Sequence, residues 1–270
     1  MRKWLILIIF SLLITGGFIG YRFYSFIFSP NVTSDDPESE LFIPVNSDFD
    51  QLVDSLKAKK LLKNYQSFSW VADRMKFSKP KGGRYLITKG WNNKSLIAHL
   101  RSGNQKAVKL TFNNLRHIEA LSSAISEQLA MDSISLLNYL RDSSFLKSVN
   151  YTEQNIMSVF IPNTYQVYWT ITPEDLLERM MEEHDRFWSG KRDSLRSALG
   201  LSREDVYTLA SIVQKESNLK KEKPIIAGVY LNRLKKGMLL QADPTVVFAV
   251  GDFEIKRVLN KHLQIDSPYN

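Results

Sequence analysis

The sequence predicts an α+β protein with an N-terminal transmembrane helix, a small module and a larger mixed α/β domain. Three observations support this. Residues Trp4 to Tyr21 carry no charged side chain. Short strand candidates alternate with helical stretches over residues 41–112, and apolar residues after that recur mainly at helical spacing. We therefore expect a membrane anchor at 1–28, a linker at 29–40, the small module at 41–112 and the larger domain at 113–270.

The N-terminal uncharged run has 18 residues, near the lower end of the roughly 17–25 that span a bilayer. If Arg22 extends to the interface, Phe23 to Phe28 can lengthen the span. Arg2 and Lys3 precede the run, so the N-terminus is expected in the cytoplasm and the bulk of the chain outside it. A cleaved signal peptide is the alternative, but no small-x-small cleavage site follows Gly20.

Residues 29–40, SPNVTSDDPESE, are polar, acidic and interrupted by proline, which is typical of a linker. The module after it should contain three short strands and three helices. We expect the strands at Phe42 to Val45, Arg84 to Ile87 and Val108 to Phe112, and the helices after a Ser47 cap, near Ser67 to Lys76, and over Lys94 to Arg101 with Gly103 as its stop.

The larger domain should be mainly helical. The first two helices are expected over Arg116 to Leu129 and Ser133 to Leu146. A third should follow a capping box that begins at Thr172, and its core residues should be Leu176, Leu177, Met180, Met181, His184 and Phe187. A fourth should begin after Ser202, and a fifth should run from Lys223-Pro224 to Lys235 with an apolar face of Ile225, Ile226, Val229, Tyr230 and Leu234.

Composition narrows the class of function. Hydrophobic residues make up 44% and charged residues 24% of the 270-residue chain, as in globular proteins. The absence of cysteine excludes disulfides and thiolate metal sites and agrees with a location outside the cytoplasm. The four histidines are dispersed and no phosphate-binding glycine loop is present, so neither a metal nor a cofactor is expected. The net charge of +8 is scattered, which disfavours nucleic acid as a partner.

Glu216 is the candidate catalytic residue. The helix that Ser202 begins carries an apolar stripe through Leu209 and Val213, and continuing this stripe by three residues reaches Glu216 in the last turn. Burial on that face and the negative end of the helix dipole both oppose ionisation, which suits a general acid near neutral pH. The alternative is an ordinary glutamate at a helix end that turns into water.

The residues around and after Glu216 carry a resemblance. The segments LASIVQKES, AGVYLNRL, GMLLQADPTV and SPYN occur in this order over Leu209 to Asn270, and the chain resembles the endolytic murein transglycosylases of the YceG-like family. IPNTYQVYW at Ile161 to Trp169 resembles the segment before the family's catalytic helix. The resemblance implies that Glu216 is catalytic and that the substrate cleft is lined by Gln241, Asp243, Thr245, Asn232 and Tyr165.

The sequence also departs from the family pattern. Asn113-Asn114 stands where a glutamate-glycine pair is expected, and the chain ends at Asn270 where family members continue into further strands. The larger domain is therefore expected to be incomplete at its C-terminus. The short strands and paired helices of residues 41–112 resemble the family's LysM-like module. Tyr85 and Trp91 are either its sugar-stacking residues or ordinary core or surface residues.

The resemblance implies a membrane-anchored enzyme that cuts the MurNAc–GlcNAc bond of peptidoglycan and leaves a 1,6-anhydro-MurNAc end, with no cofactor. Peptidoglycan strands are the expected partner, and peptidoglycan synthases are further candidates. Two alternatives stay open. A hydrolytic muramidase would use Asp243 as a second carboxylate, and a non-catalytic scaffold would bind the wall without cutting it.

Overall fold

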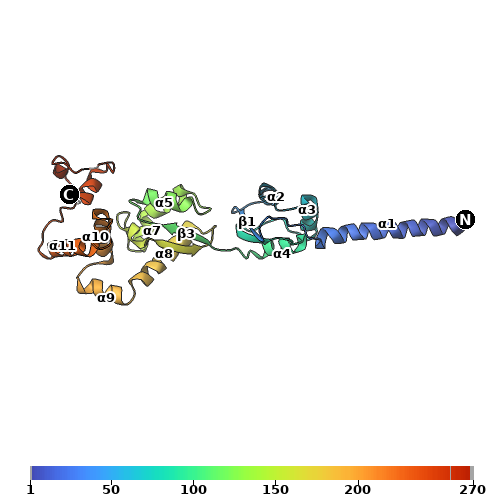
Figure 1. Ribbon diagram of the computed structural model, residues 1–270, viewed down its shortest axis with the longest axis horizontal. Helices are drawn as coiled ribbons and strands as arrows, with labels where there is room; N and C mark the ends of the chain where they lie inside the picture. Colours follow the sequence, from blue (N-terminus) through green and yellow to red (C-terminus); the bar gives the residue numbers. More distant parts are fainter. Residues whose placement is uncertain (1, 256, 268–270) are drawn as a thin grey trace. The chain divides into compact units, whose positions relative to one another are not determined.

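The computed structural model describes residues 2–255 and 257–267 (Figure 1). The described chain is a mixed α+β structure, as predicted. Its elements in order are α1 (Arg2–Phe28), β1 (Glu38–Ile43), α2 (Phe49–Ala58), α3 (Tyr65–Arg74), β2 (Gly83–Thr88), α4 (Asn93–Ser102), β3 (Val108–Phe112), α5 (Ile118–Ser126), α6 (Ser133–Arg141), α7 (Ser143–Ser148), the 3-10 helix η1 (Ile156–Val159), β4 (Asn163–Val167), α8 (Pro173–Trp188), α9 (Lys191–Ala198), α10 (Arg203–Glu216), α11 (Lys223–Lys235), α12 (Asp243–Val250) and the 3-10 helix η2 (His262–Gln264).

The chain divides into two compact units. Unit 1 contains Met1–Asp142 and Pro162–Glu178, and unit 2 contains Ser143–Ile161 and Arg179–Asn270. The division at residues 112 and 113 that the sequence suggests is therefore not where the contacts divide. The reason is long-range pairing: β3, which was to close the small module, pairs antiparallel with β4, from Val108↔Val167 to Phe112↔Asn163.

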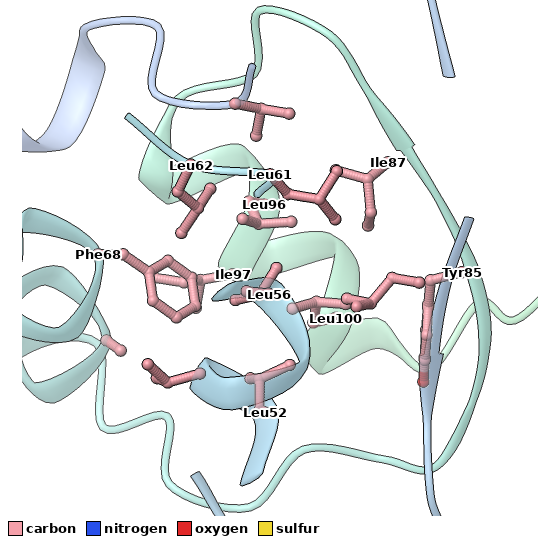
Figure 2. Close-up of a cluster of buried hydrophobic side chains, with 14 of the residues drawn as sticks. Leu52, Leu56, Leu61, Leu62, Phe68, Tyr85, Ile87, Leu96, Ile97 and Leu100 are labelled. Atoms are coloured by element: carbon pink, nitrogen blue, oxygen red, sulfur yellow. The ribbon is translucent and has the colours of Figure 1, made fainter. Parts of the chain in front are cut away.

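Within unit 1, β1 and β2 form an antiparallel pair from Glu38↔Thr88 to Ile43↔Gly83, and helices α2, α3 and α4 pack with them. Alternate residues of β2 are buried, as expected for a strand with one face on a core. Figure 2 shows side chains from α2, α3, α4 and β2 meeting in this core. Tyr85 is among the fully buried residues, and its hydroxyl donates to the Lys81 carbonyl at 2.9 Å. Tyr85 is thus a core residue.

Local signals fix the ends of these helices. Helix α4 ends at Gly103, which has φ of 71° and accordingly adopts the left-handed conformation that glycine tolerates. The cap of α2 differs from the prediction by one residue. Asp48, not Ser47, is the N-cap, and it forms a reciprocal capping box with Gln51. Ser47 instead donates to the Pro44 carbonyl.

Residues 29–40 do not form a free linker. Val32 is 2% exposed and bridges to Leu62, and β1 already begins at Glu38. Asn31 is also buried, and its side chain bonds to Asn64 and Asn93. A polar composition predicted a linker, but these two inward-facing residues bind the segment to the module.

Helix α1 contains an apolar stretch, Ile6–Phe28, of 23 residues, long enough by length and composition to cross a bilayer. It extends beyond the uncharged run, as the sequence suggested. Its last two turns pack on the module: Phe26 and Ile27 contact the core, and Phe23 stacks on Trp70 with ring centroids 4.9 Å apart.

The helix expected over Ser133 to Leu146 is two helices, α6 and α7. Asp142 separates them with φ of −64° and ψ of 108°, an extended conformation. Aspartate favours such positions because it competes with the helical backbone for hydrogen bonds. The boundary between the two units falls at this break.

Candidate functional site

Helix α10 presents the predicted acid at its last residue. Ser202 accepts from the Asp205 amide and Asp205 accepts from the Ser202 amide, so the predicted capping box begins the helix. Leu209, Ile212 and Val213 form its buried face, whereas Ala210 is exposed. Since α10 ends at Glu216, three residues beyond Val213, the acid lies at the edge of this face.

The buried face of α10 packs against α11 and α12. Tyr230 of α11 and Ala242, just before α12, join Leu209, Ile212 and Val213 in one core cluster. Proline at the start of α11 and of α12 fits the first turn, where an amide donor is not needed. The cluster thereby holds the end of α10 near the start of α12.

The expected burial of Glu216 is wrong, because the residue is exposed. The stripe that predicted burial is covered by Tyr230 and Ala242, but it ends with the helix, so Glu216 lies at its margin. There the Tyr230 hydroxyl donates to Glu216 Oε1 at 2.7 Å. The acid is therefore open to solvent on one side and held in place by a phenol on the other.

Tyr230 was predicted only as part of the apolar face of α11. It is 7% exposed and is the main buried residue of that face, since Ile225 and Val229 are largely exposed. Burial, the hydrogen bond to Glu216 and the charge of that carboxylate together raise the pKa of the Tyr230 phenol far above its usual value. Tyr230 thus stays a hydrogen-bond donor over the working pH range. A tyrosine on an otherwise aliphatic face was the sequence signal for this role.

The segment Gln241 to Thr245 leads into α12 beside this pair. Gln241 has φ of 50°, an uncommon left-handed conformation for a residue with a side chain. Its side-chain oxygen accepts from Arg233 at 3.1 Å, and the same guanidinium donates to the Leu240 carbonyl at 2.8 Å. Arg233, which sequence reasoning missed, thereby holds the segment in this conformation.

The other residues that were predicted to line the substrate cleft do not all lie beside Glu216. Asp243 is exposed at the first position of α12, and its charge acts on Tyr230. The Thr245 hydroxyl donates to the Ala242 carbonyl at 2.8 Å. Asn232 is exposed on α11, two residues and so about 200° around the helix from Tyr230. Tyr165 belongs to β4 in unit 1, where it is 6% exposed and stacks on Phe112.

The site contains two carboxylates, Glu216 and Asp243, one phenol and several amide and hydroxyl groups, a set suited to binding a polar polymer and moving a proton. Among the described residues, no group of three or more His, Cys, Asp or Glu side chains could hold a metal ion. Pro268, Tyr269 and Asn270 of the predicted SPYN segment lie outside the described residues.

The fold and this site define an α+β protein with an N-terminal apolar helix and a helical unit that exposes a glutamate held by a buried tyrosine. The model of the YceG-like family matches residues 41–270, so the chain belongs to the YceG-like family. The resemblance noted in the sequence is thus confirmed.

Several known proteins are similar to this chain. A Bacillus subtilis protein named an endolytic murein transglycosylase is 27% identical over 244 residues, covering 84% of this chain and 67% of that protein. A Streptococcus pneumoniae protein of the same name is 22% identical over 294 residues, covering 98% of this chain and 53% of that protein. The chain therefore spans about half to two thirds of these relatives.

A crystal structure of a yceG-like protein from Listeria monocytogenes has a similar fold. The TM-score is 0.53 at 24% sequence identity, and the match covers 87% of this chain and 82% of that one. This likeness supports the α+β fold described above.

Proposed function

We propose that the chain acts as a lytic transglycosylase on peptidoglycan, with Glu216 as its general acid and base. The observation that carries this proposal is the position of Glu216, exposed at a helix end and held by Tyr230 beside the Gln241 to Thr245 segment. The named activity of the relatives points to the same chemistry. Exposure of the acid suits the substrate, because a glycan strand must reach it from outside.

In the first step, protonated Glu216 donates its proton to the oxygen between MurNAc and GlcNAc as the bond to MurNAc C1 breaks. The sugar passes through an oxocarbenium-like state. In the second step, the Glu216 carboxylate takes the proton of the MurNAc C6 hydroxyl while O6 bonds to C1. The products are a free GlcNAc hydroxyl and a 1,6-anhydro-MurNAc end, and no water is consumed.

Tyr230 supports both steps. When Glu216 is protonated on Oε2, Oε1 still accepts from the phenol, and when it is ionised the same hydrogen bond continues. The bond fixes the carboxyl group in one orientation, so proton transfer needs no reorganisation of the side chain. Tyr230 is therefore a positioning residue.

The polar groups of the segment beside Glu216 are assigned to the sugar. We assign Gln241 and Asp243 to orienting the strand and Thr245 to a further contact, with Asn232 of α11 as an additional contact outside this segment. Tyr165 is buried against Phe112 in unit 1 and is given no part in this site. The module at residues 41–112 is proposed to be LysM-like and to bind glycan. Because Tyr85 is buried, Trp91, which is half-buried against His99 with ring centroids 5.0 Å apart, is the remaining stacking candidate there.

Helix α1 is proposed to anchor the chain by a single span with its N-terminus in the cytoplasm, because Arg2 and Lys3 precede the apolar stretch. The catalytic unit then faces the wall, where newly made strands and the synthases that make them are the expected partners.

The test is digestion of purified peptidoglycan by the full chain in neutral detergent, followed by mass analysis of the products. The wild type should release fragments with 1,6-anhydro ends. Glu216→Gln should be slower by about 100-fold or more, since general acid–base catalysis contributes about 10²- to 10⁴-fold. Glu204→Gln, at the opposite end of α10, is the matched control and should cut like the wild type.

Other outcomes point to other functions. Reducing ends, heavier than anhydro ends by one water, would indicate a hydrolytic muramidase with Asp243 as second carboxylate, and Asp243→Asn would then abolish cutting. Equal cutting by wild type and Glu216→Gln would remove Glu216 from the mechanism. Binding without cutting by both would indicate a wall-binding scaffold.

A further inference from the structure

The junction between helix α1 and the small module is held by a buried polar network. Asn93, which is 1% exposed, donates to the Phe26 carbonyl at 2.8 Å and to Ser67 Oγ at 3.0 Å. Asn31 donates to Asn93 Oδ1 at 2.7 Å. Buried amides of this kind are costly to leave unpaired, so the network fixes the last turn of α1 against α3 and α4.

This junction lies at the level of the lipid headgroups if α1 spans the membrane as proposed. The 23 residues of Ile6–Phe28 extend about 34 Å at 1.5 Å per residue. The hydrocarbon layer is about 30 Å thick, so the last turn of α1 reaches the interface. Trp70, which stacks on Phe23, is the residue type that prefers this level.

A pocket of about 280 Å³ opens at this junction. It is lined by Ile27 and Phe28 at the end of α1, by Trp70, Val71, Arg74 and Met75 of α3, and by Lys94 of α4. The lining residues of α1 belong to the apolar stretch itself, so the wall of the pocket continues the surface that would face lipid.

Two exposed cations lie among the residues lining this apolar pocket. The Arg74 guanidinium lies 5.5 Å from the Trp70 ring centroid, and the Lys94 ammonium lies 5.5 Å from the Phe28 ring centroid. Within the described residues, neither cation forms a salt bridge with a carboxylate. Both are therefore held over aromatic rings with their charges available to a ligand.

We propose that this pocket binds the headgroup of an anionic phospholipid of the membrane that α1 spans. The phosphate would lie between Arg74 and Lys94, and the start of an acyl chain would lie along Ile27 and Phe28. A lipid fits better than a free anion because the pocket has both an apolar wall and a pair of cations. The apolar wall can contact the acyl chains of a phospholipid, and the cations can bind its phosphate. The inference rests on the proposed anchoring by α1 and is independent of the glycan chemistry.

The test uses the full chain in neutral detergent micelles, titrated with dioleoyl phosphatidylglycerol, dioleoyl phosphatidylcholine or inorganic phosphate, with the thermal unfolding midpoint as readout. Phosphatidylglycerol should raise the midpoint, whereas phosphatidylcholine should raise it less and inorganic phosphate should leave it unchanged. Arg74→Gln/Lys94→Gln should need about 30-fold more phosphatidylglycerol for half the shift, at about fivefold per cation near an anionic lipid surface. Lys79→Gln/Lys106→Gln, which removes two exposed cations that do not line the pocket, should respond like the wild type.

Equal responses of the two double variants would overturn the proposal, as would equal responses to the two lipids. A full shift by inorganic phosphate alone would show a free-anion site instead. Anchoring is measured separately, by whether the wild-type chain stays with membranes after an alkaline wash. Loss of the chain in that wash would contradict the anchor, whereas retention with equal lipid responses would contradict only the lipid site.

Discussion

The hydrogen bond between Tyr230 and Glu216 gives the clearest test of how the acid is held. Tyr230→Phe removes only the hydroxyl and leaves the ring in its core cluster. Because a hydrogen bond to a charged group contributes about 1.5–3 kcal/mol, we expect peptidoglycan cutting to slow by about 10- to 150-fold. The measurement is the rate of release of anhydro ends at saturating substrate.

If Tyr230 only stabilised the fold, Tyr230→Phe would lower the unfolding midpoint. Glu216 is exposed and can bind water in place of the phenol, so the unfolding midpoint of Tyr230→Phe should match that of the wild type. The loss should be in kcat and not in KM, since the hydroxyl contacts the acid and not the sugar. A rate like that of the wild type would show that Glu216 needs no support from Tyr230.

The end of helix α8 predicts how stability depends on pH. His184 is 2% exposed, and its Nε2 accepts a hydrogen bond from Trp188 Nε1 at 3.0 Å. Since an indole N–H can only donate, this nitrogen must be unprotonated. Burial and then the charge of Arg203 lower the pKa of His184, partly opposed by Asp185 and Glu204. Folding therefore favours the neutral imidazole.

Because the folded state holds this proton less tightly than the unfolded state, the contribution of His184 is present above pH 6.5 and is lost as pH falls through the lower folded pKa. We expect the free energy of unfolding to fall between pH 7.5 and pH 5 more steeply in the wild type than in His184→Gln, which keeps an acceptor for the indole. Urea unfolding at several pH values measures this. Parallel curves for the two proteins would contradict it.

The elements that the sequence predicted best are those with local end signals. The Ser202–Asp205 capping box, the proline that opens α11 and the left-handed Gly103 were all read from a few neighbouring residues. Glu216 was likewise placed correctly in the last turn of its helix. These features depend on backbone chemistry within one or two turns, so no knowledge of the tertiary structure was needed.

The predictions that failed depended on distant partners. The burial of Glu216 depended on what covers the end of α10, and the linker failed because Asn31 bonds to Asn64 and Asn93 far along the chain. The pairing of β3 with a strand more than 50 residues later was equally invisible to local patterns. Tyr230 and Arg233 gained their roles only when α11 packed against α10.

The proposed anchoring of the whole chain by α1, and its direction, can be tested because the sequence contains no cysteine. A single cysteine at the exposed position of Asn114, just after β3, should react with a membrane-impermeant maleimide in right-side-out vesicles. A cysteine inserted after Met1 should react only once the vesicles are opened. The reverse pattern would place the catalytic unit in the cytoplasm, away from the wall.

The Asn31–Asn93 network fixes the end of α1 to the module, so the two rotate together about the helix axis. One extra residue in α1 after Gly17 would rotate the module by about 100° and shift it by about 1.5 Å relative to the preceding turns. An insertion of seven residues, close to two full turns, would nearly restore the original rotation of the module about the helix axis but would move the module further along that axis. In a chain anchored by α1 as proposed, the length of the apolar helix therefore sets the rotational orientation of the module about the helix axis as well as its distance from the bilayer.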